Sequence, residues 1–144
     1  VVECRVPGGE MDRVNTSDPA FFDWPSDSPA ALTVLVVEDE PMIAIELLTL
    51  ISERGGKALG PFGAIDAAKA AIANVHIDGA IVDLDLNGEM SFDVANLLED
   101  AHVPFVIYTG IDPRLLPPRH RRIPCLQKPC TGTDVVDRLF AVMQ

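Results

Sequence analysis

The sequence predicts an α/β fold in which helices cover both faces of a parallel sheet. Five short apolar runs alternate with longer amphipathic segments, which is the order expected of repeated strand–helix units. The apolar runs are continuous and do not alternate with polar residues, which indicates strands buried on both faces. Polar residues follow the runs directly, at the sheet edge where open parallel sheets bind their ligands.

The first half of the predicted domain contains three strands and two helices. The first strand is β-branched, and Pro41 after it suits the first turn of a helix that Gly55-Gly56 end. A weak second strand and an alanine-rich helix precede the third strand, which ends at Asp83 and breaks into an Asn87-Gly88 turn. In chain order, the predicted elements are strand 33–37, a helix from residue 41 to the glycines, strand 58–60, helix 65–75 and a strand from residue 79 to Asp83.

The second half adds two strands and two helices. Ser91 is placed to cap the third helix, and either Thr131 or Thr133 is placed to cap the last one. Between these helices, a stretch rich in Pro and Arg leaves room for at most a short helix. In chain order, the predicted elements are helix 91–98, strand 104–108, a short helix within 113–116, strand 123–127 and a last helix with its apolar face over 135–142.

Composition divides the chain into an N-terminal extension and one folded domain. Residues 1–30 are rich in Pro, Gly, Ser, Asn and Asp, which predicts a flexible extension, whereas residues 31–144 suit a single domain. No apolar run approaches the roughly 18 residues of a membrane span, and no signal-peptide pattern is present. Together with a low cysteine content, these features predict a reduced, cytoplasmic protein.

The net charge of −11 disfavours direct binding to nucleic acid or to an anionic membrane. One basic cluster contrasts with this charge. Two prolines split the cluster, and no aromatic residue interleaves for base stacking. We therefore expect a solvated loop or a surface for a protein partner, with no nucleic acid and no membrane bound. The cluster consists of Arg114, Arg119, His120, Arg121 and Arg122.

Polar residues follow four of the five predicted strands. Glu38 and Asp39 follow the first strand, Asp83 the third, Thr109 the fourth and Lys128 the fifth. Because the carboxyl ends of parallel strands meet at one edge, we expect these side chains to converge. Three neighbouring carboxylates repel one another, and a hard cation with oxygen ligands relieves the repulsion. The sequence therefore predicts Mg²⁺, or Mn²⁺ in its place, on Glu38, Asp39 and Asp83.

These groups are the ones that phosphoryl transfer requires. Asp83 can attack phosphorus as a nucleophile, while the cation and Lys128 neutralise phosphoryl oxygens. The Thr109 hydroxyl can donate to a phosphoryl oxygen, so we expect its rotamer to report phosphorylation. A cis peptide bond before Pro129 would aim the ammonium inward. Asp85 lies past the strand end, so its side chain is expected in a solvated turn and only its backbone carbonyl in reach of the metal.

Four motifs that contain these residues resemble, in their order and spacing, the receiver domain of bacterial two-component response regulators. The resemblance covers residues 32–143 and implies a doubly wound, flavodoxin-like sheet with strand order 2-1-3-4-5. The motifs are Val34-Leu35-Val36-Val37-Glu38-Asp39-Glu40, Ala80-Ile81-Val82-Asp83, Val106-Ile107-Tyr108-Thr109-Gly110 and Gln127-Lys128-Pro129.

The resemblance also implies a role for each residue of the predicted site. Asp83 becomes the phospho-acceptor, Glu38 and Asp39 the acid pair that holds Mg²⁺, Thr109 the switch hydroxyl and Lys128 the phosphate-binding lysine. The donor would be a phosphohistidine on a sensor histidine kinase or a phosphotransfer protein, and a downstream protein partner would respond to the switch. The protein would not be an enzyme beyond self-phosphorylation and slow autodephosphorylation. A homodimer stays open.

The sequence departs from the family pattern at three places. Cys125 stands three residues before Lys128, where the family usually has an aromatic switch residue, although Tyr108 is near the site in sequence. Asn87-Gly88 replaces the usual proline after the acceptor loop, and the helix expected at 112–118 is degenerate. The Asp-Leu-Asp-Leu-Asn-Gly-Glu loop, the Tyr-Thr-Gly turn and the Leu-Pro-Pro segment are similar to stand-alone receivers of alphaproteobacteria, in which the degenerate helix accompanies kinase-network signalling and not DNA binding.

Three alternative interpretations stay open from the residues alone. Asp83-Leu84-Asp85 also resembles the first motif of haloacid-dehalogenase-like phosphatases, but in that family the metal-binding acid pair comes last, whereas Glu38-Asp39 comes first here. A second alternative is a non-signalling interaction module, which the complete set of acids, Thr109 and Lys128 argues against. The third is a receiver that has been separated from an output domain.

Overall fold

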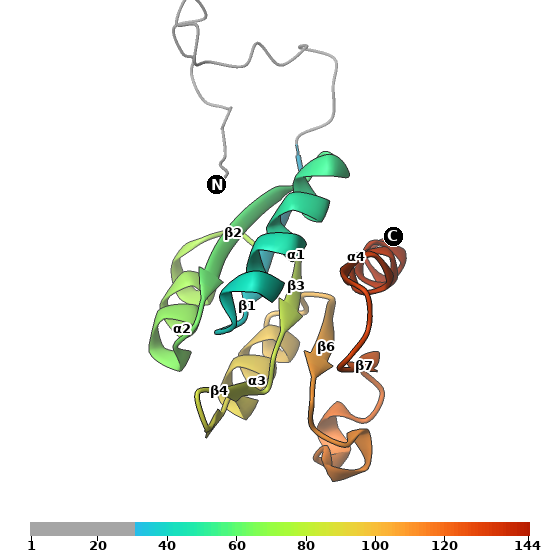
Figure 1. Ribbon diagram of the computed structural model, residues 1–144. Helices are drawn as coiled ribbons and strands as arrows, with labels where there is room; N and C mark the ends of the chain where they lie inside the picture. Colours follow the sequence, from blue (N-terminus) through green and yellow to red (C-terminus); the bar gives the residue numbers. More distant parts are fainter. Residues whose placement is uncertain (1–30) are drawn as a thin grey trace, which may run out of the picture.

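The computed structural model describes residues 31–144 (Figure 1), so the predicted extension at residues 1–30 lies outside the described residues. Five parallel strands form one sheet in the order β2-β1-β3-β6-β7. This order confirms the predicted one, because β6 and β7 are the fourth and fifth strands of this sheet along the chain. The strands are β1 (Thr33–Val37), β2 (Lys57–Phe62), β3 (Gly79–Val82), β6 (Phe105–Thr109) and β7 (Cys125–Gln127).

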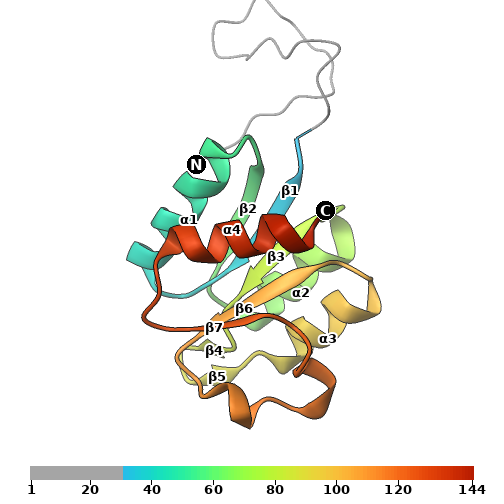
Figure 2. The same cartoon turned by 90° about the vertical axis from the view of Figure 1, so that its right-hand side faces the viewer.

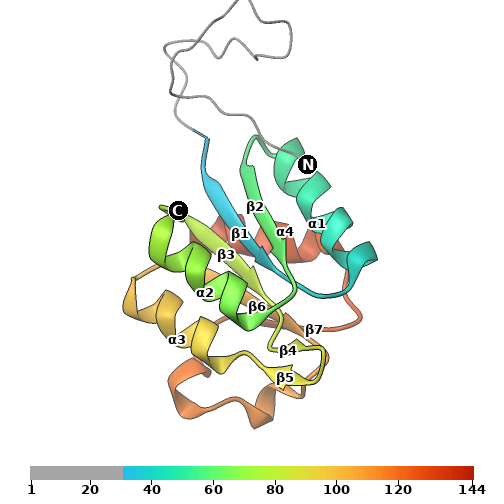
Figure 3. The same ribbon diagram turned by 90° about the vertical axis from the view of Figure 1, so that its left-hand side faces the viewer.

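Two α-helices cover each face of the sheet. Figure 2 shows α1 and α4 on one face, and Figure 3 shows α2 and α3 on the other. None of the described helices is long and apolar enough to cross a membrane. The helices are α1 (Pro41–Glu53), α2 (Ile65–Asn74), α3 (Phe92–Asp100) and α4 (Gly132–Val142).

Alternate residues of each central strand contribute to two separate cores. Val34 and Val36 of β1 pack in the core beneath α1 and α4, whereas Leu35 and Val37 pack in the core beneath α2 and α3. All four side chains are fully buried. The pleat of a strand sends neighbouring side chains to opposite faces, and here both faces are covered. The continuous apolar runs of the sequence follow from this arrangement.

Local signals place the ends of the elements correctly in most cases. Pro41 is the first residue of α1, as predicted, and Thr131 is the threonine that caps α4, because its Oγ1 accepts a hydrogen bond of 3.1 Å from the Asp134 N–H. Strand β2 is longer than predicted and includes Pro61. A proline is tolerated there because β2 lies at the edge of the sheet.

A small hairpin follows β3 that the sequence analysis did not predict. Its two strands are β4 (Asp85–Leu86) and β5 (Glu89–Met90), joined by the predicted Asn87-Gly88 turn. Both turn residues have positive φ, 54° for Asn87 and 89° for Gly88, which is the backbone that an Asn-Gly hairpin turn requires. Strands of two residues are too short to carry an alternating pattern, so only the turn was visible in the sequence.

The segment between β6 and β7 contains two 3₁₀ turns and no α-helix; the first lies within the predicted 113–116 stretch, and the second was not predicted. They are η2 (Pro113–Leu115) and η3 (Pro118–His120). Prolines lack the backbone N–H that an α-helix needs, and their rings clash with the preceding turn. A continuous helix is therefore excluded across this segment.

The basic cluster of this segment is partly engaged within the domain. Arg119 donates hydrogen bonds to Glu99 and Asp100 of α3, and Arg114 pairs with a neighbouring aspartate. His120 is buried, with its Nδ1 3.0 Å from Glu99 Oε1 in a direction unsuited to a hydrogen bond. The cluster is thus only partly the solvated loop that we predict from composition, because Arg119 binds two acids of α3 and the His120 ring stacks on Phe92 of α3.

Replacing Thr131 by Ala should lower the free energy of unfolding by about 1 kcal/mol, because the Asp134 N–H loses its capping oxygen. Urea unfolding followed by circular dichroism measures the change. Thr133→Ala is the matched control, since Thr133 is an exposed residue inside α4 and is not the cap. An equal loss in both variants would contradict the assignment of the cap to Thr131.

Candidate functional site

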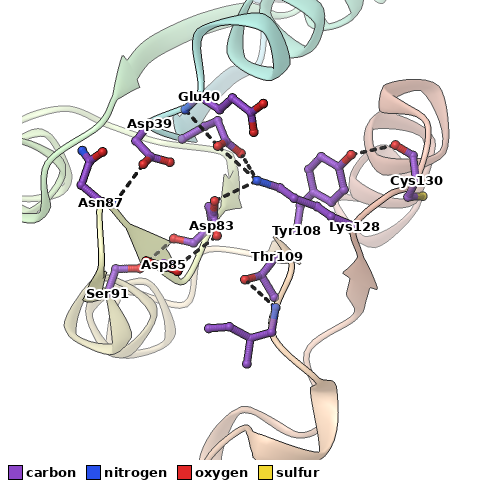
Figure 4. A network of polar contacts seen from close by, with 12 residues as sticks. Asp39, Glu40, Asp83, Asp85, Asn87, Ser91, Tyr108, Thr109, Lys128 and Cys130 are labelled. Carbon is purple, nitrogen blue, oxygen red and sulfur yellow. Dashed lines mark hydrogen bonds and ion pairs between the residues drawn. The ribbon is translucent and has the colours of Figure 1, made fainter.

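The candidate site lies at the carboxyl ends of four parallel strands (Figure 4). Glu38 follows β1, Asp83 follows β3, Thr109 is the last residue of β6 and Lys128 follows β7. The strand pairing sets this convergence: the Asp83 N–H donates to Val37 O, and the Lys128 N–H donates to Thr109 O. The four strand ends that the sequence analysis singled out therefore meet at one edge of the sheet.

Three carboxylates form the centre of the site. One oxygen each from Glu38, Asp39 and Asp83 lies within 4.8 Å of the other two. Glu38 and Asp83 are 3% and 4% exposed, and Asp39 is half-buried. Buried carboxylates are costly unless a cation or hydrogen bonds compensate them. The arrangement therefore requires a positive partner.

Lys128 supplies that partner. Its Nζ lies 2.9 Å from Asp83 Oδ2, and 3.1 Å and 3.2 Å from the two carboxylate oxygens of Glu38. The peptide bond between Lys128 and Pro129 is cis, as the sequence analysis anticipated. Figure 4 shows the lysine side chain reaching across from the β7 side toward Asp83. One ammonium thus serves two buried carboxylates.

The pKa values of Glu38 and Lys128 reflect the sharing of one ammonium between two buried carboxylates. Burial and the neighbouring Asp83 charge raise the pKa of Glu38 to about 7, although Lys128 acts in the opposite direction. Burial alone would lower the pKa of Lys128, but its hydrogen bonds and charge interactions with Asp83 and Glu38 together raise it. The ammonium is therefore charged at neutral pH, and the carboxylates still have unmet negative charge.

Backbone N–H groups hold each carboxylate in place. The Asp85 N–H donates to Asp83 Oδ1 at 3.0 Å, and the Asn87 N–H donates to Asp39 Oδ2 at 2.9 Å. The β4–β5 hairpin therefore positions two of the three acids. The side chain of Asp85 is exposed and accepts the Gly88 N–H, which is the turn role predicted for it.

Ser91 is a residue of the site that the sequence analysis assigned to a different role. It occupies the cap position of α3, but its side chain makes no capping hydrogen bond. It is fully buried, and its Oγ donates to the backbone carbonyl of Asp83 at 2.7 Å. The sequence carries no signal for this contact, because it depends on the hairpin returning Ser91 to the end of β3.

Thr109 and Tyr108 lie side by side on β6 and make different contacts. Thr109 is fully buried, and its Oγ1 accepts the Ile111 N–H at 3.3 Å. The Tyr108 hydroxyl donates to the Cys130 carbonyl at 2.7 Å, and Lys128 Nζ lies 5.3 Å from the centre of the tyrosine ring. The hydroxyl of Thr109 is thus at the predicted edge, bound to the following loop.

The donor set suits a hard divalent cation. All three converging side chains are carboxylates, which Mg²⁺ and Mn²⁺ prefer, and no His or Cys belongs to the cluster. A phosphoryl group has the same requirement for positive charge as these acids, which Lys128 can supply. The edge can therefore bind a cation and an anionic phosphoryl group next to each other.

Comparisons with solved structures give a consistent result, although no family model and no curated protein matches the chain. SdrG from Sphingomonas melonis Fr1 is 35% identical; the match covers 81% of this chain and 98% of that one, with a TM-score of 0.69. The BeF₃-activated conformation of SdrG from Pseudomonas melonis Fr1 is 34% identical, with coverage of 80% and 98% and a TM-score of 0.64. The receiver domain of the Erythrobacter litoralis response regulator PhyR, at 24% identity, shares the fold, with coverage of 78% and 89% and a TM-score of 0.67.

Replacing Ser91 by Ala should lower the free energy of unfolding by about 1–3 kcal/mol, because the Asp83 carbonyl loses a buried hydrogen bond. Ser52→Ala is the matched control, since Ser52 is exposed on α1. Urea unfolding of both variants measures the difference. If Ser91→Ala unfolds like Ser52→Ala, the contact does not contribute to the stability of the site.

Proposed function

The chain belongs to the receiver domains of bacterial two-component response regulators, and from this membership we propose that it is switched by a phosphoryl group on Asp83. In this proposal the donor is a phosphohistidine on a sensor histidine kinase or a phosphotransfer protein. Residues 31–144 form the receiver domain, and its state is recognised by a downstream protein in the cytoplasm. The convergence of Lys128 and three carboxylates at one sheet edge carries the proposal.

Asp83 is the acceptor in this proposal because it alone combines three properties. It directly follows the central strand β3, it belongs to the acid cluster, and its Oδ2 contacts Lys128. In the transfer, a carboxylate oxygen of Asp83 forms a bond to phosphorus while the bond from phosphorus to the donor's imidazole nitrogen breaks. The imidazole leaves as a neutral group once its other nitrogen carries a proton. Lys128 then pairs with the new phosphoryl oxygens instead of the free carboxylate.

The transfer is proposed to depend on Mg²⁺, or Mn²⁺ in its place. Glu38, Asp39 and Asp83 would hold the ion with their carboxylates, and Asp85 with its backbone carbonyl. The unmet negative charge of this cluster supports the assignment, as does its all-oxygen donor set. A bound cation supplies further charge neutralisation for the phosphoryl oxygens.

The response to phosphorylation is proposed to begin at Thr109. Its hydroxyl, which now accepts the Ile111 N–H, would turn to donate to a phosphoryl oxygen. That movement would change the surface formed by β6, β7 and α4. A structure of SdrG described as BeF₃-activated supports an activated state for this kind of domain. The phosphatase alternative has less support, because the neighbouring structures are receiver domains.

Incubation with acetyl phosphate and Mg²⁺ should add one phosphoryl group to the wild-type chain, as measured by intact mass. Asp83→Asn should abolish the adduct, because an amide oxygen is a poor nucleophile. Asp93→Asn is the matched control, since Asp93 is an exposed aspartate on α3. An adduct that persists in Asp83→Asn would contradict the acceptor, and steady release of many equivalents of phosphate would favour a phosphatase.

Mg²⁺ should raise the free energy of unfolding by about 1.4 kcal/mol when its concentration is tenfold above the dissociation constant. Asp39→Asn should remove most of this increase, because the cluster loses one of its three carboxylates. Glu40→Gln is the control, since Glu40 is exposed and outside the cluster. Thermal unfolding across a Mg²⁺ titration measures both. Equal Mg²⁺ responses in the two variants would contradict the metal site.

A further inference from the structure

Tyr108 occupies a position from which it can report the state of Lys128. It is the only tyrosine in the chain, and it is 4% exposed. We propose that Tyr108 is a positioning residue that transmits a change at Lys128 to the amino-terminal end of α4. This inference rests on the proposed function, because it takes the change at Lys128 to be phosphorylation of Asp83.

The first step is the contact between the tyrosine ring and the ammonium. Lys128 Nζ lies 5.3 Å from the ring centre and is the same atom that pairs with Asp83 Oδ2 at 2.9 Å. A cation near an aromatic face is attracted by the ring. When a phosphoryl group on Asp83 attracts the ammonium to a new position, the environment of the Tyr108 ring changes with it.

The second step is the hydrogen bond from the ring to the turn before α4. The Tyr108 hydroxyl donates to the Cys130 carbonyl at 2.7 Å, as Figure 4 shows. Burial is the main cause that raises the pKa of Tyr108, so the hydroxyl keeps the proton that it donates. Cys130 lies between Pro129 and the helix cap Thr131. A movement of the Tyr108 ring is therefore transmitted through this hydrogen bond to Cys130, the residue before the helix cap.

The third step is the tight packing where α4 begins. Gly132 is the first residue of α4 and lies against Glu46 of α1; a Cβ atom at Gly132 would stand 2.7 Å from the carboxyl carbon of Glu46. Gly132 is itself buried, and only a residue without a side chain fits this close to Glu46. Because the Cys130 turn leads directly into this contact, a shift of the turn is expected to displace the start of α4 relative to α1.

Position 125 cannot provide this route. Cys125 is half-buried and packs against the core beneath α2 and α3, whereas Tyr108 packs in the core beneath α1 and α4. The thiol has no ring to contact Lys128 and lies on the opposite face of the sheet from α4. The only tyrosine therefore connects the acceptor site to the α1–α4 face.

The test uses the full chain with ¹³C-labelled tyrosine, which gives a single set of ring signals, and with ¹³C-carbonyl-labelled cysteine. Beryllofluoride with Mg²⁺ serves as the phosphoryl mimic. In the wild type, we expect the Tyr108 ring, the Cys130 carbonyl and the amides of Thr131 and Gly132 to shift. In Tyr108→Phe, which keeps the ring and loses the hydroxyl, we expect the Thr131 and Gly132 shifts to be lost while acetyl phosphate still adds mass.

Thr131→Ala is the control, because it weakens the start of α4 without removing the Tyr108 contact; its α4 shifts should remain. Unchanged α4 shifts in Tyr108→Phe, or an unmoved Tyr108 ring and Cys130 carbonyl in the wild type, would overturn the inference. The wild-type signals decide the matter if Tyr108→Phe fails to fold. A wild-type chain that takes up neither phosphate nor beryllofluoride would overturn the proposed function, and the inference with it.

Discussion

The ammonium of Lys128 is the group on which the site depends. It contacts both buried carboxylates, Glu38 and Asp83. Lys128 follows the edge strand β7, which is separated from β1 by β3 and β6. Without it, two carboxylates would be buried with only backbone N–H groups as partners. Because one positive charge faces three acids, the edge keeps an excess of negative charge. That excess suits the site to a cation, and the charges of Asp83 and Glu38 together hold the lysine in place.

The parallel sheet determines which residues can share this edge. Every strand of the sheet runs in the same direction, so each strand ends at the edge where the next one ends. Glu38 and Lys128 are 90 residues apart in sequence, yet their side chains are 3.2 Å apart, and Asp83 lies 2.9 Å from the same ammonium. The two covered faces keep water from the strands below. The buried charged groups of the site are therefore found at the strand ends and not along the covered strands.

The segment between β6 and β7 is held against α3 and does not form a helix of its own. Its prolines exclude a regular helix, and Arg119 and His120 attach it to α3. Helix α4, in contrast, is joined to the site through the Cys130 turn, whose carbonyl accepts the hydrogen bond of the Tyr108 hydroxyl. In the proposed switch, a change at Lys128 reaches the α1–α4 face through this turn.

The sequence by itself determined the fold class, the strand ends and the residues of the acid–lysine cluster, because burial on both faces and parallel strand direction are encoded in local patterns. Ser91 is at the predicted cap position of α3, but its side chain does not cap the helix, because the short β4–β5 hairpin returns that serine to the Asp83 carbonyl. The attachment of Arg119 to α3 and the contact of Tyr108 with Cys130 were decided only by the tertiary structure. These three contacts join residues that are 8 to 22 positions apart in the sequence. They depend on how the turns and loops fold back on the domain, and no periodic pattern in the sequence encodes that.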